Sequence, residues 1–289
     1  MSYTTEAFLE QVKLLASLPS GRYEDEEILA TAYDQLTSTV IPLILGVKEE
    51  FYVASETQAV IAGQSAYPIP YRALGLTLRE VKLIRGTEIV DLARIDPTEI
   101  RTTEAGTPWA FYLEGLDVVL YPTPNLADGA LKLSYFQAPS RPVLVSEAAQ
   151  IVDIDRAAGV ITAAVPTSWT TADTFDFVSR RNGHRSLGQD IVATDVSAST
   201  SLTVATGDIP SSLSVGDYVA LAGESVYFQM PDNCYRLLIQ LTANEFLGSM
   251  DALPALQAGQ AMAQKLEVIV RSQLSTRVQG APKRLRITL

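Results

Sequence analysis

The sequence predicts an α+β protein in which N- and C-terminal helices form an antiparallel bundle and two β modules are inserted between them. Apolar residues recur at helical spacing near both ends of the chain. Short runs of β-branched and aromatic residues, separated by glycine and proline, fill its middle. A chain of 289 residues can bury cores for two or three domains. The predicted domains are the helical residues 1–61 with 229–289, a small β domain at 62–144, and an inserted sandwich- or barrel-like β module at 145–228.

Two helices are predicted before the first β module. Thr4 or Thr5 can cap a helix that runs to about Ser17, with an apolar stripe of Phe8, Val12 and Leu15. A longer helix begins at Asp25, and its apolar positions are Ile28, Ala32, Leu36, Val40 and Leu43. Pro42 is expected to kink or terminate the last turn of this helix, because proline lacks the backbone N–H.

The first β domain is predicted from strand-like runs that glycine and proline interrupt. The expected strands are Phe51–Ser55, Tyr67–Ile69, Leu78–Arg85, Trp109–Glu114, Val118–Tyr121 and Ala130–Phe136. Gly115 to Asp117 fits a short hairpin loop. Asp96 to Ile100 reads as a helical turn, with proline at a first helical position.

The second β module is predicted from six short strands at even spacing. They are Gln150–Ile154, Val160–Thr162, Thr174–Val178, Asp190–Thr194, Ser201–Ala205 and Tyr218–Ala222. Such spacing with turn residues between is typical of a small sandwich or barrel.

The C-terminal segment is expected to hold two helices. Asp232 can cap the first, which carries Tyr235, Leu238, Ile239 and Phe246 and which Gly248 can close. Ser249 is expected to cap the last helix, whose predicted apolar side is Leu253, Leu256, Met262, Leu266 and Ile269. Small residues allow close approach within the subunit and between neighbours: Ala252, Ala255, Ala258, Ala261 and Ala263.

Composition narrows the class of protein. One cysteine, Cys234, excludes an internal disulfide and favours a reducing compartment. The N-terminus has no basic lead or apolar h-region, so no signal peptide is expected, and no apolar run is long enough to predict a membrane span. Net charge is −11, divided as −7, −1, −6 and +3 over residues 1–61, 62–144, 145–228 and 229–289. Acidity of this size disfavours tight DNA binding, which depends on basic phosphate contacts, yet suits the wall of a DNA conduit as well as simple solubility.

Candidate chemical sites are few. Asp153 with Asp155, and Asp173 with Asp176, have the oxygen ligands of a Ca²⁺ site, but the EF-hand loop pattern is absent. The acidic run at 24–27 complements a helix dipole and is not expected to bind metal.

The basic cluster Arg180–Arg185 can touch phosphate or form a solvated turn. It contains the single histidine, His184, whose pairing with Cys234 as a nucleophilic dyad is disfavoured, because Cys234 falls among core-like residues. We therefore predict no catalytic residue, cofactor or metal, although paired acids suited to glycan cleavage are not visible to sequence analysis.

The order of short motifs along the chain resembles that of tailed-bacteriophage head-to-tail adaptor (neck or connector) proteins. The central motif is Gly106-Thr-Pro-Trp-Ala-Phe-Tyr-Leu-Glu-Gly followed by Leu120-Tyr-Pro-Thr-Pro124. Tyr67-Pro-Ile-Pro-Tyr-Arg72 precedes it, and Met230-Pro-Asp232 opens an apolar helix after it. The resemblance covers roughly residues 1–144 and 229–289, whereas the module at 145–228 departs from the shorter relatives.

The resemblance implies a structural virion protein without enzymatic activity. It implies a homo-oligomeric ring, expected to be a dodecamer, that lies under the portal protein in the neck between capsid and tail. The implied partners are the portal, downstream neck or tail proteins, and genomic DNA that passes through the channel during ejection without tight binding. Assembly in the host bacterial cytoplasm follows. The alternatives are another tail-completion or fibre-attachment ring and, less favoured, a cell-wall glycan hydrolase.

The basic tail beyond Gly280 is the candidate portal-docking segment. It alternates basic and apolar residues: Lys283, Arg284, Leu285, Arg286, Ile287 and Leu289. Alternation of this kind fits a strand that adds to a partner's sheet, and a frayed chain end fits equally well.

Overall fold

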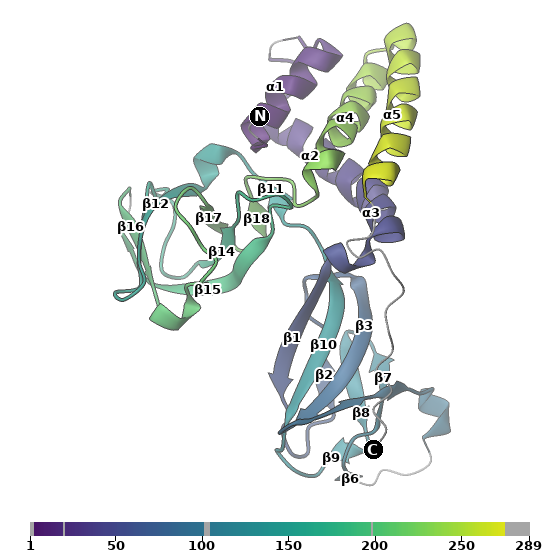
Figure 1. The fold of residues 1–289 in the computed structure, drawn as a ribbon, viewed down its shortest axis with the longest axis vertical. Helices are drawn as coiled ribbons and strands as arrows, with labels where there is room; N and C mark the ends of the chain where they lie inside the picture. Colours follow the sequence, from purple (N-terminus) through teal and green to yellow (C-terminus); the bar gives the residue numbers. More distant parts are fainter. Residues whose placement is uncertain (1–2, 20, 101–104, 198, 275–289) are drawn as a thin grey trace. The chain divides into compact units, whose positions relative to one another are not determined.

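The computed structural model describes residues 3–19, 21–100, 105–197 and 199–274. Its contacts divide the chain into two compact units, Met1–Lys48 with Pro139–Leu289 and Glu49–Ala138. The first unit holds helices and a β-barrel, and the second holds β-sheets (Figure 1). The mixed α+β class is therefore confirmed. The three-part division at 61/62, 144/145 and 228/229 stays a prediction.

The first helix, α1, runs from Thr5 to Ala16. The Thr4 side chain accepts a long hydrogen bond from the Ala7 amide (3.5 Å), as a cap does. Phe8, Leu9 and Val12 are buried. The predicted stripe was wrong at Leu15, which is exposed, because Leu9 rather than Leu15 completes the buried face.

The second helix continues through Pro42 instead of ending there. It consists of α2 (Asp25–Gln35), a π-helical segment (Leu36–Val40) and α3 (Ile41–Val47). Proline occupies the first turn of α3, where a missing N–H costs least. The wide π turn lies directly before it and re-registers the backbone hydrogen bonds. All five predicted apolar positions of this helix are buried.

Residues Asp25–Val47 also form the one helix, within the described part of the chain, that is long and apolar enough to cross a membrane. Core helices pass the same test, and Ile28, Ala32 and Leu36 are fully buried inside this unit.

Two helices follow the barrel, α4 (Tyr235–Ser249) and α5 (Leu253–Gln273). The predicted caps were wrong. A 3₁₀ turn, Asp232–Cys234, precedes α4, and the Asp232 carboxylate contacts His184 instead of capping the helix. Ser249 is the last residue of α4, and its hydroxyl donates to the Phe246 carbonyl. Helix α4 contacts α1, α2 and α5, and lies between α1 and α5 (Figure 1).

The inserted module folds as a closed six-stranded barrel. Its strands are β12 (Ala149–Asp155), β13 (Val160–Ala163), β14 (Thr174–Val178), β15 (Ser186–Ser197), β16 (Ser201–Val204) and β17 (Tyr218–Leu221). They close in the order β12-β13-β16-β15-β14-β17, with antiparallel pairing throughout. Phe175, Phe177 and Leu202 are fully buried in its core. All six predicted strands overlap the observed ones.

A short parallel ribbon joins the barrel's two ends. It pairs β11 (Arg141–Pro142) with β18 (Glu224–Ser225). The N-terminus adds to this junction, because Thr4 bridges Tyr227 and the Thr5 amide donates to the Val226 carbonyl at 2.9 Å. The helices and the barrel therefore meet at the ribbon.

The second unit contains two four-stranded sheets that share one apolar core. One sheet has the order β1-β10-β3-β4, with β1 at Val53–Ala59, β10 at Ala130–Gln137, β3 at Ala73–Arg85 and β4 at Glu88–Asp91. The other has the order β2-β8-β7-β5, with β2 at Ala66–Pro68, β8 at Asp117–Tyr121, β7 at Ala110–Glu114 and β5 at Ala93–Arg94. Two further short strands, β6 (Ala105–Gly106) and β9 (Thr123–Pro124), pair in parallel. The predicted hairpin of β7 and β8 is confirmed by their register.

The barrel contains a buried carboxylate whose hydrogen bonds hold three loop groups. Asp217 is fully buried, and it accepts from the Arg180 amide, the Ser214 amide and the Ser214 hydroxyl at 2.8–2.9 Å. Replacing Asp217 with alanine leaves these donors unpaired, so we expect a loss on the order of 3 kcal/mol in the free energy of unfolding. Urea denaturation measures it. The exposed Asp208→Ala is the matched control, and equal stabilities of the two variants would contradict the structural role of Asp217.

Candidate functional site

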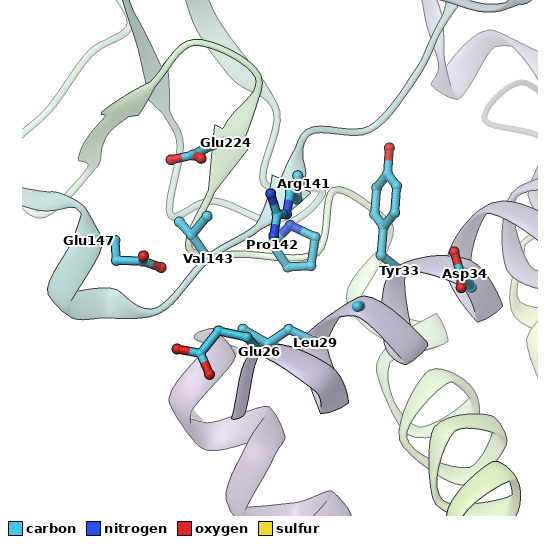
Figure 2. Close-up of a pocket in the computed structure, with 10 residues that line it drawn as sticks. Glu26, Leu29, Tyr33, Asp34, Arg141, Pro142, Val143, Glu147 and Glu224 are labelled. Atoms are coloured by element: carbon cyan, nitrogen blue, oxygen red, sulfur yellow. The ribbon is translucent and has the colours of Figure 1, made fainter. Parts of the chain in front are cut away.

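A pocket of about 260 Å³ lies where α2 faces the ribbon at the base of the barrel (Figure 2). Helix α2 supplies one wall, and β11, β18 and the 3₁₀ turn Val145–Glu147 supply the other. The residues that line it are Glu26, Leu29, Ala30, Tyr33, Asp34, Arg141, Pro142, Val143, Glu147 and Glu224. The pocket is therefore built from three segments that are far apart in the sequence.

The walls of the pocket carry four carboxylates and one guanidinium. Glu26 and Asp34 come from α2, whereas Glu147 and Glu224 lie on the barrel side, with Arg141 between them in the view (Figure 2). Within the described residues, no ion pair joins Arg141 to any of these carboxylates. The excess of negative charge attracts cationic groups, and this electrostatic attraction is the chemistry that the pocket offers.

Glu224 and Tyr33 titrate differently from their exposed counterparts. Partial burial raises the pKa of the Glu224 carboxyl, and the nearby Glu147 raises it further while Arg141 lowers it. Burial, followed by the charge of Asp34, raises the pKa of Tyr33. The Tyr33 hydroxyl stays protonated and donates to the Pro139 carbonyl at 3.1 Å.

His184 lies at a second junction between the barrel and the helices. The basic cluster that contains it forms the loop between β14 and β15, and the imidazole is buried, so a purely solvated turn was the wrong expectation for this residue. Its Nε2 lies 3.1 Å from Asp232 Oδ1 and its Nδ1 lies 3.4 Å from the Ser179 carbonyl. Burial lowers the pKa of His184, although the Asp232 charge opposes this shift.

The disfavoured Cys234–His184 dyad gains no support from the geometry. Both imidazole nitrogens face other partners, Asp232 and the Ser179 carbonyl. Burial raises the pKa of the Cys234 thiol to about 12, so the thiolate nucleophile is not populated at neutral pH.

The aspartates considered for Ca²⁺ have structural roles. Asp155 accepts from the amides of Ala157 and Ala158 in a turn. Asp173 accepts from Thr170, and Asp176 accepts from the amides of Asp190 and Gly223. Within the described residues, no group of three or more potential metal ligands comes together.

Two apolar helix faces are exposed. On α1, Leu14 is 81% exposed, and Leu15 lies beside it in sequence. On α5, the predicted apolar side was wrong as a buried face, because Met262, Val268 and Ile269 are exposed, the last two at 68% and 46%. Helix α5 buries Gly259, Ala263 and Val270 instead. These faces are candidate docking surfaces.

The predicted portal-docking residues, Lys283 to Leu289, lie outside the described residues. Sequence analysis missed the pocket, since it depends on the pairing of Arg141 with Glu224, 83 positions apart. A local signal existed in the proline-flanked Arg141 and the acidic first turn of α2, but neither indicates that the two segments meet.

Comparison with known proteins identifies the family. The family profile described as SU10 adaptor protein matches residues 9–165, which is more than half of the chain. The chain belongs to the SU10 adaptor protein family. No curated protein matches the chain. The matched range begins in α1 and ends just after β13, so α4, α5 and the strands β14 to β17 lie outside it.

Membership in the SU10 adaptor family confirms the resemblance to phage head-to-tail adaptors. It assigns the chain to the structural proteins of bacteriophages and favours that class over a glycan hydrolase. It also places the chain among virion components of the head–tail junction, which associate with other head or tail proteins.

The raised pKa of Glu224 generates a pH-dependent prediction. A carboxyl whose folded-state pKa exceeds its ordinary value of 4.5 destabilises the fold at neutral pH, and this cost disappears below about pH 4.5. We expect Glu224→Gln to stabilise the protein at pH 7 by less than about 1 kcal/mol, because solvent screens this partly exposed site. The gain should vanish at pH 4. Thermal unfolding at both pH values measures it, with the exposed Glu114→Gln as control, and a gain that persists at pH 4 would refute the explanation.

Proposed function

We propose that this SU10 adaptor forms a twelve-fold homo-oligomeric ring in the virion neck. The ring lies between the portal and the downstream neck or tail proteins and extends the DNA channel. It assembles in the host bacterial cytoplasm and performs no reaction. The family match, together with two unpartnered apolar helix faces, supports this proposal.

The helical layer has the features of an interlocking ring element. We infer that its N- and C-terminal helices form an antiparallel bundle, since α4 contacts α1, α2 and α5, and only Met250–Ala252 separates α4 from α5. The exposed face of α1 and that of α5 lie on opposite sides of α4 (Figure 1). Two different faces on opposite sides favour a head-to-tail contact between copies, and such contacts close into rings.

The proposed interface pairs α5 of one copy with α1 of the next. Met262 and Ile269 are seven residues apart and share a face, along which Ala258 also lies. Leu14 and Leu15 present the complementary apolar surface on α1. Burying exposed leucine, methionine and isoleucine side chains gives each contact a hydrophobic driving force.

The bore of the ring is proposed to conduct DNA without holding it. Net charge of −11 repels the phosphate backbone and leaves few cations to replace its counterions. Genomic DNA is therefore a passing partner during ejection and not a tightly bound one.

Residues 281–289 are proposed as the portal contact. Their three cations, Lys283, Arg284 and Arg286, stand out in an acidic chain. The alternating Leu285, Ile287 and Leu289 suit an added strand, in which main-chain hydrogen bonds provide affinity and every second side chain enters a pocket.

The first test of this proposal is assembly. Purified protein, alone or mixed with portal, should give ring-shaped particles in negative stain and a ring-sized species in light scattering. Met262→Glu should abolish the ring, because a buried unpaired charge is costly at an interface, while leaving the fold of the monomer intact.

The matched control for assembly is Gln260→Glu, an exposed residue near the opposite side of α5. It should assemble normally. A wild-type chain that stays monomeric with portal present would contradict the ring, and equal assembly of both variants would contradict the α5 interface.

The second test concerns the tail. Deleting residues 281–289 should leave thermal stability nearly unchanged and abolish co-sedimentation of the ring with portal. Replacing the three cations with glutamine, and separately the three apolar residues with serine, distinguishes electrostatic attachment from strand addition. Normal attachment of the deleted form would show that the tail is a frayed end.

A further inference from the structure

The loop between β14 and β15 carries polar contacts from the barrel to the segment that begins α4. His184 Nε2 contacts Asp232 Oδ1 at 3.1 Å, and the Asp232 amide donates to Asn182 Oδ1 at 3.2 Å. At the end of this loop, Gln229 Nε2 donates to the Ser186 hydroxyl at 2.9 Å. His184 and Asp232 lie 48 residues apart in the chain, so their contact is a tertiary link.

His184 is held in a conformation that its neighbours must maintain. Its φ is 46°, in the left-handed region that side-chain-bearing residues seldom adopt, and Gly183 before it has φ 95°. The imidazole is 4% exposed and stacks on Tyr227, with ring centroids 4.4 Å apart and planes inclined by 15°. Tyr3 packs nearby at 5.7 Å. Strain of this kind persists only where surrounding contacts outweigh it.

Both ring nitrogens of His184 face hydrogen-bond acceptors. One is a carboxylate oxygen of Asp232 and the other is the Ser179 carbonyl. Neutral imidazole has one N–H, and the shorter contact assigns it to Nε2, donating to Asp232. Nδ1 then faces the carbonyl without a proton, at the longer distance of 3.4 Å. The pair is therefore complete in its first hydrogen bond and incomplete in its second.

Opposing groups surround a proton on this ring. Asp232, at the start of α4, and the Ser179 carbonyl favour the charged form. Burial among Tyr3 and Tyr227 disfavours it and is the larger effect, so the pKa of His184 is lowered.

The remaining groups add no second negative charge at the ring. Its own loop contributes Arg180, Arg181 and Arg185, and Tyr235 and Tyr218 pack behind Tyr3 and Tyr227 as neutral phenols. Burial raises the pKa of both tyrosines, which keeps them neutral.

We propose that His184 is an acid-sensitive latch: the neutral ring fastens the β14–β15 loop to the start of α4, and proton uptake releases the loop. This device is independent of ring formation. A released His184 lies in water and takes up a proton near pH 6.5, whereas the latched ring resists it. Below pH 6.5 the open form therefore binds more protons and becomes favoured, until the pH falls below the pKa of the latched ring.

The linkage sets the size of the effect. Between pH 7 and pH 5.5, an open-state pKa of about 6.5 and a much lower latched pKa raise the opening equilibrium up to about eightfold. Release frees a histidine whose left-handed backbone is maintained by its contacts, so reclosure requires deprotonation. The barrel's tie to α4 is thereby made conditional on pH.

The single histidine makes the proton directly observable. The full-length protein labelled with ¹³C at histidine Cε1 gives one imidazole resonance, whose titration reports the pKa of His184. We expect a value below 6.5. Amide hydrogen exchange, corrected for its intrinsic pH dependence, should show residues 179–186 and 229–235 opening up to about eightfold more at pH 5.5 than at pH 7. Peptides of the Glu49–Ala138 unit should not change.

Two variants separate the latch from general acid sensitivity. His184→Asn keeps a side chain that tolerates left-handed backbone and donates to Asp232, yet does not titrate, so the opening should lose its pH dependence. Asp232→Asn removes the charge that supports the proton and should lower the His184 pKa in the latched state. A wild-type resonance that titrates at or above 6.5, or unchanged pH dependence in His184→Asn, would overturn the proposal. The wild-type titration decides the question even if a variant fails to fold.

Discussion

The parallel pairing of β11 with β18 is the constraint on which the helix-and-barrel unit depends. The chain leaves the N-terminal helices at Lys48 and returns at Pro139, then leaves again for the barrel. The ribbon holds the start and end of that second excursion together through Arg141–Glu224 and Pro142–Ser225. An inserted module leaves its host undisturbed when its ends lie close together. The barrel can therefore be added to this adaptor without disturbing the packing of α4 on α1 and α2.

The junction is buried, and its polar groups are paired. The Thr5 hydroxyl donates to the Val143 carbonyl at 2.7 Å, and the Ser225 hydroxyl both donates to the Tyr227 carbonyl and accepts from its amide. Across the described residues, every buried side-chain nitrogen or oxygen has a partner. Because an unpaired buried polar group costs about as much as a lost hydrogen bond, this pairing fixes one arrangement of the three segments. Apolar packing of Val178, Ala220 and Val226 alone would specify that arrangement less strictly.

The sequence predicted most elements and few of their neighbours. The barrel strands were visible because even spacing and turn residues act locally, and closure needed only that the ends pair. The caps at Asp232 and Ser249 were misassigned because each side chain has a tertiary or local carbonyl partner that outcompetes the helix amides. The pocket around Glu224 was invisible, since nothing local in Arg141 or Glu26 indicates that β11 meets α2. The family was recognised from motif order, whereas the site depended on three-dimensional contacts.

Helix α5 shows most directly that the packing of one chain is unfinished. It approaches α4 through Gly259, where an added Cβ would lie 2.1 Å from Asn244 Oδ1, so only glycine allows this spacing. The same contact contains the Gln240–Asn244 hydrogen bond, which makes the α4–α5 interface close and partly polar. The larger apolar side chains, Met262 and Ile269, point elsewhere and remain exposed. An isolated helix pair would gain more by turning these residues inward. The arrangement is stable only if their exposure is temporary, and a second subunit is the partner whose apolar α1 face is always available at equal concentration.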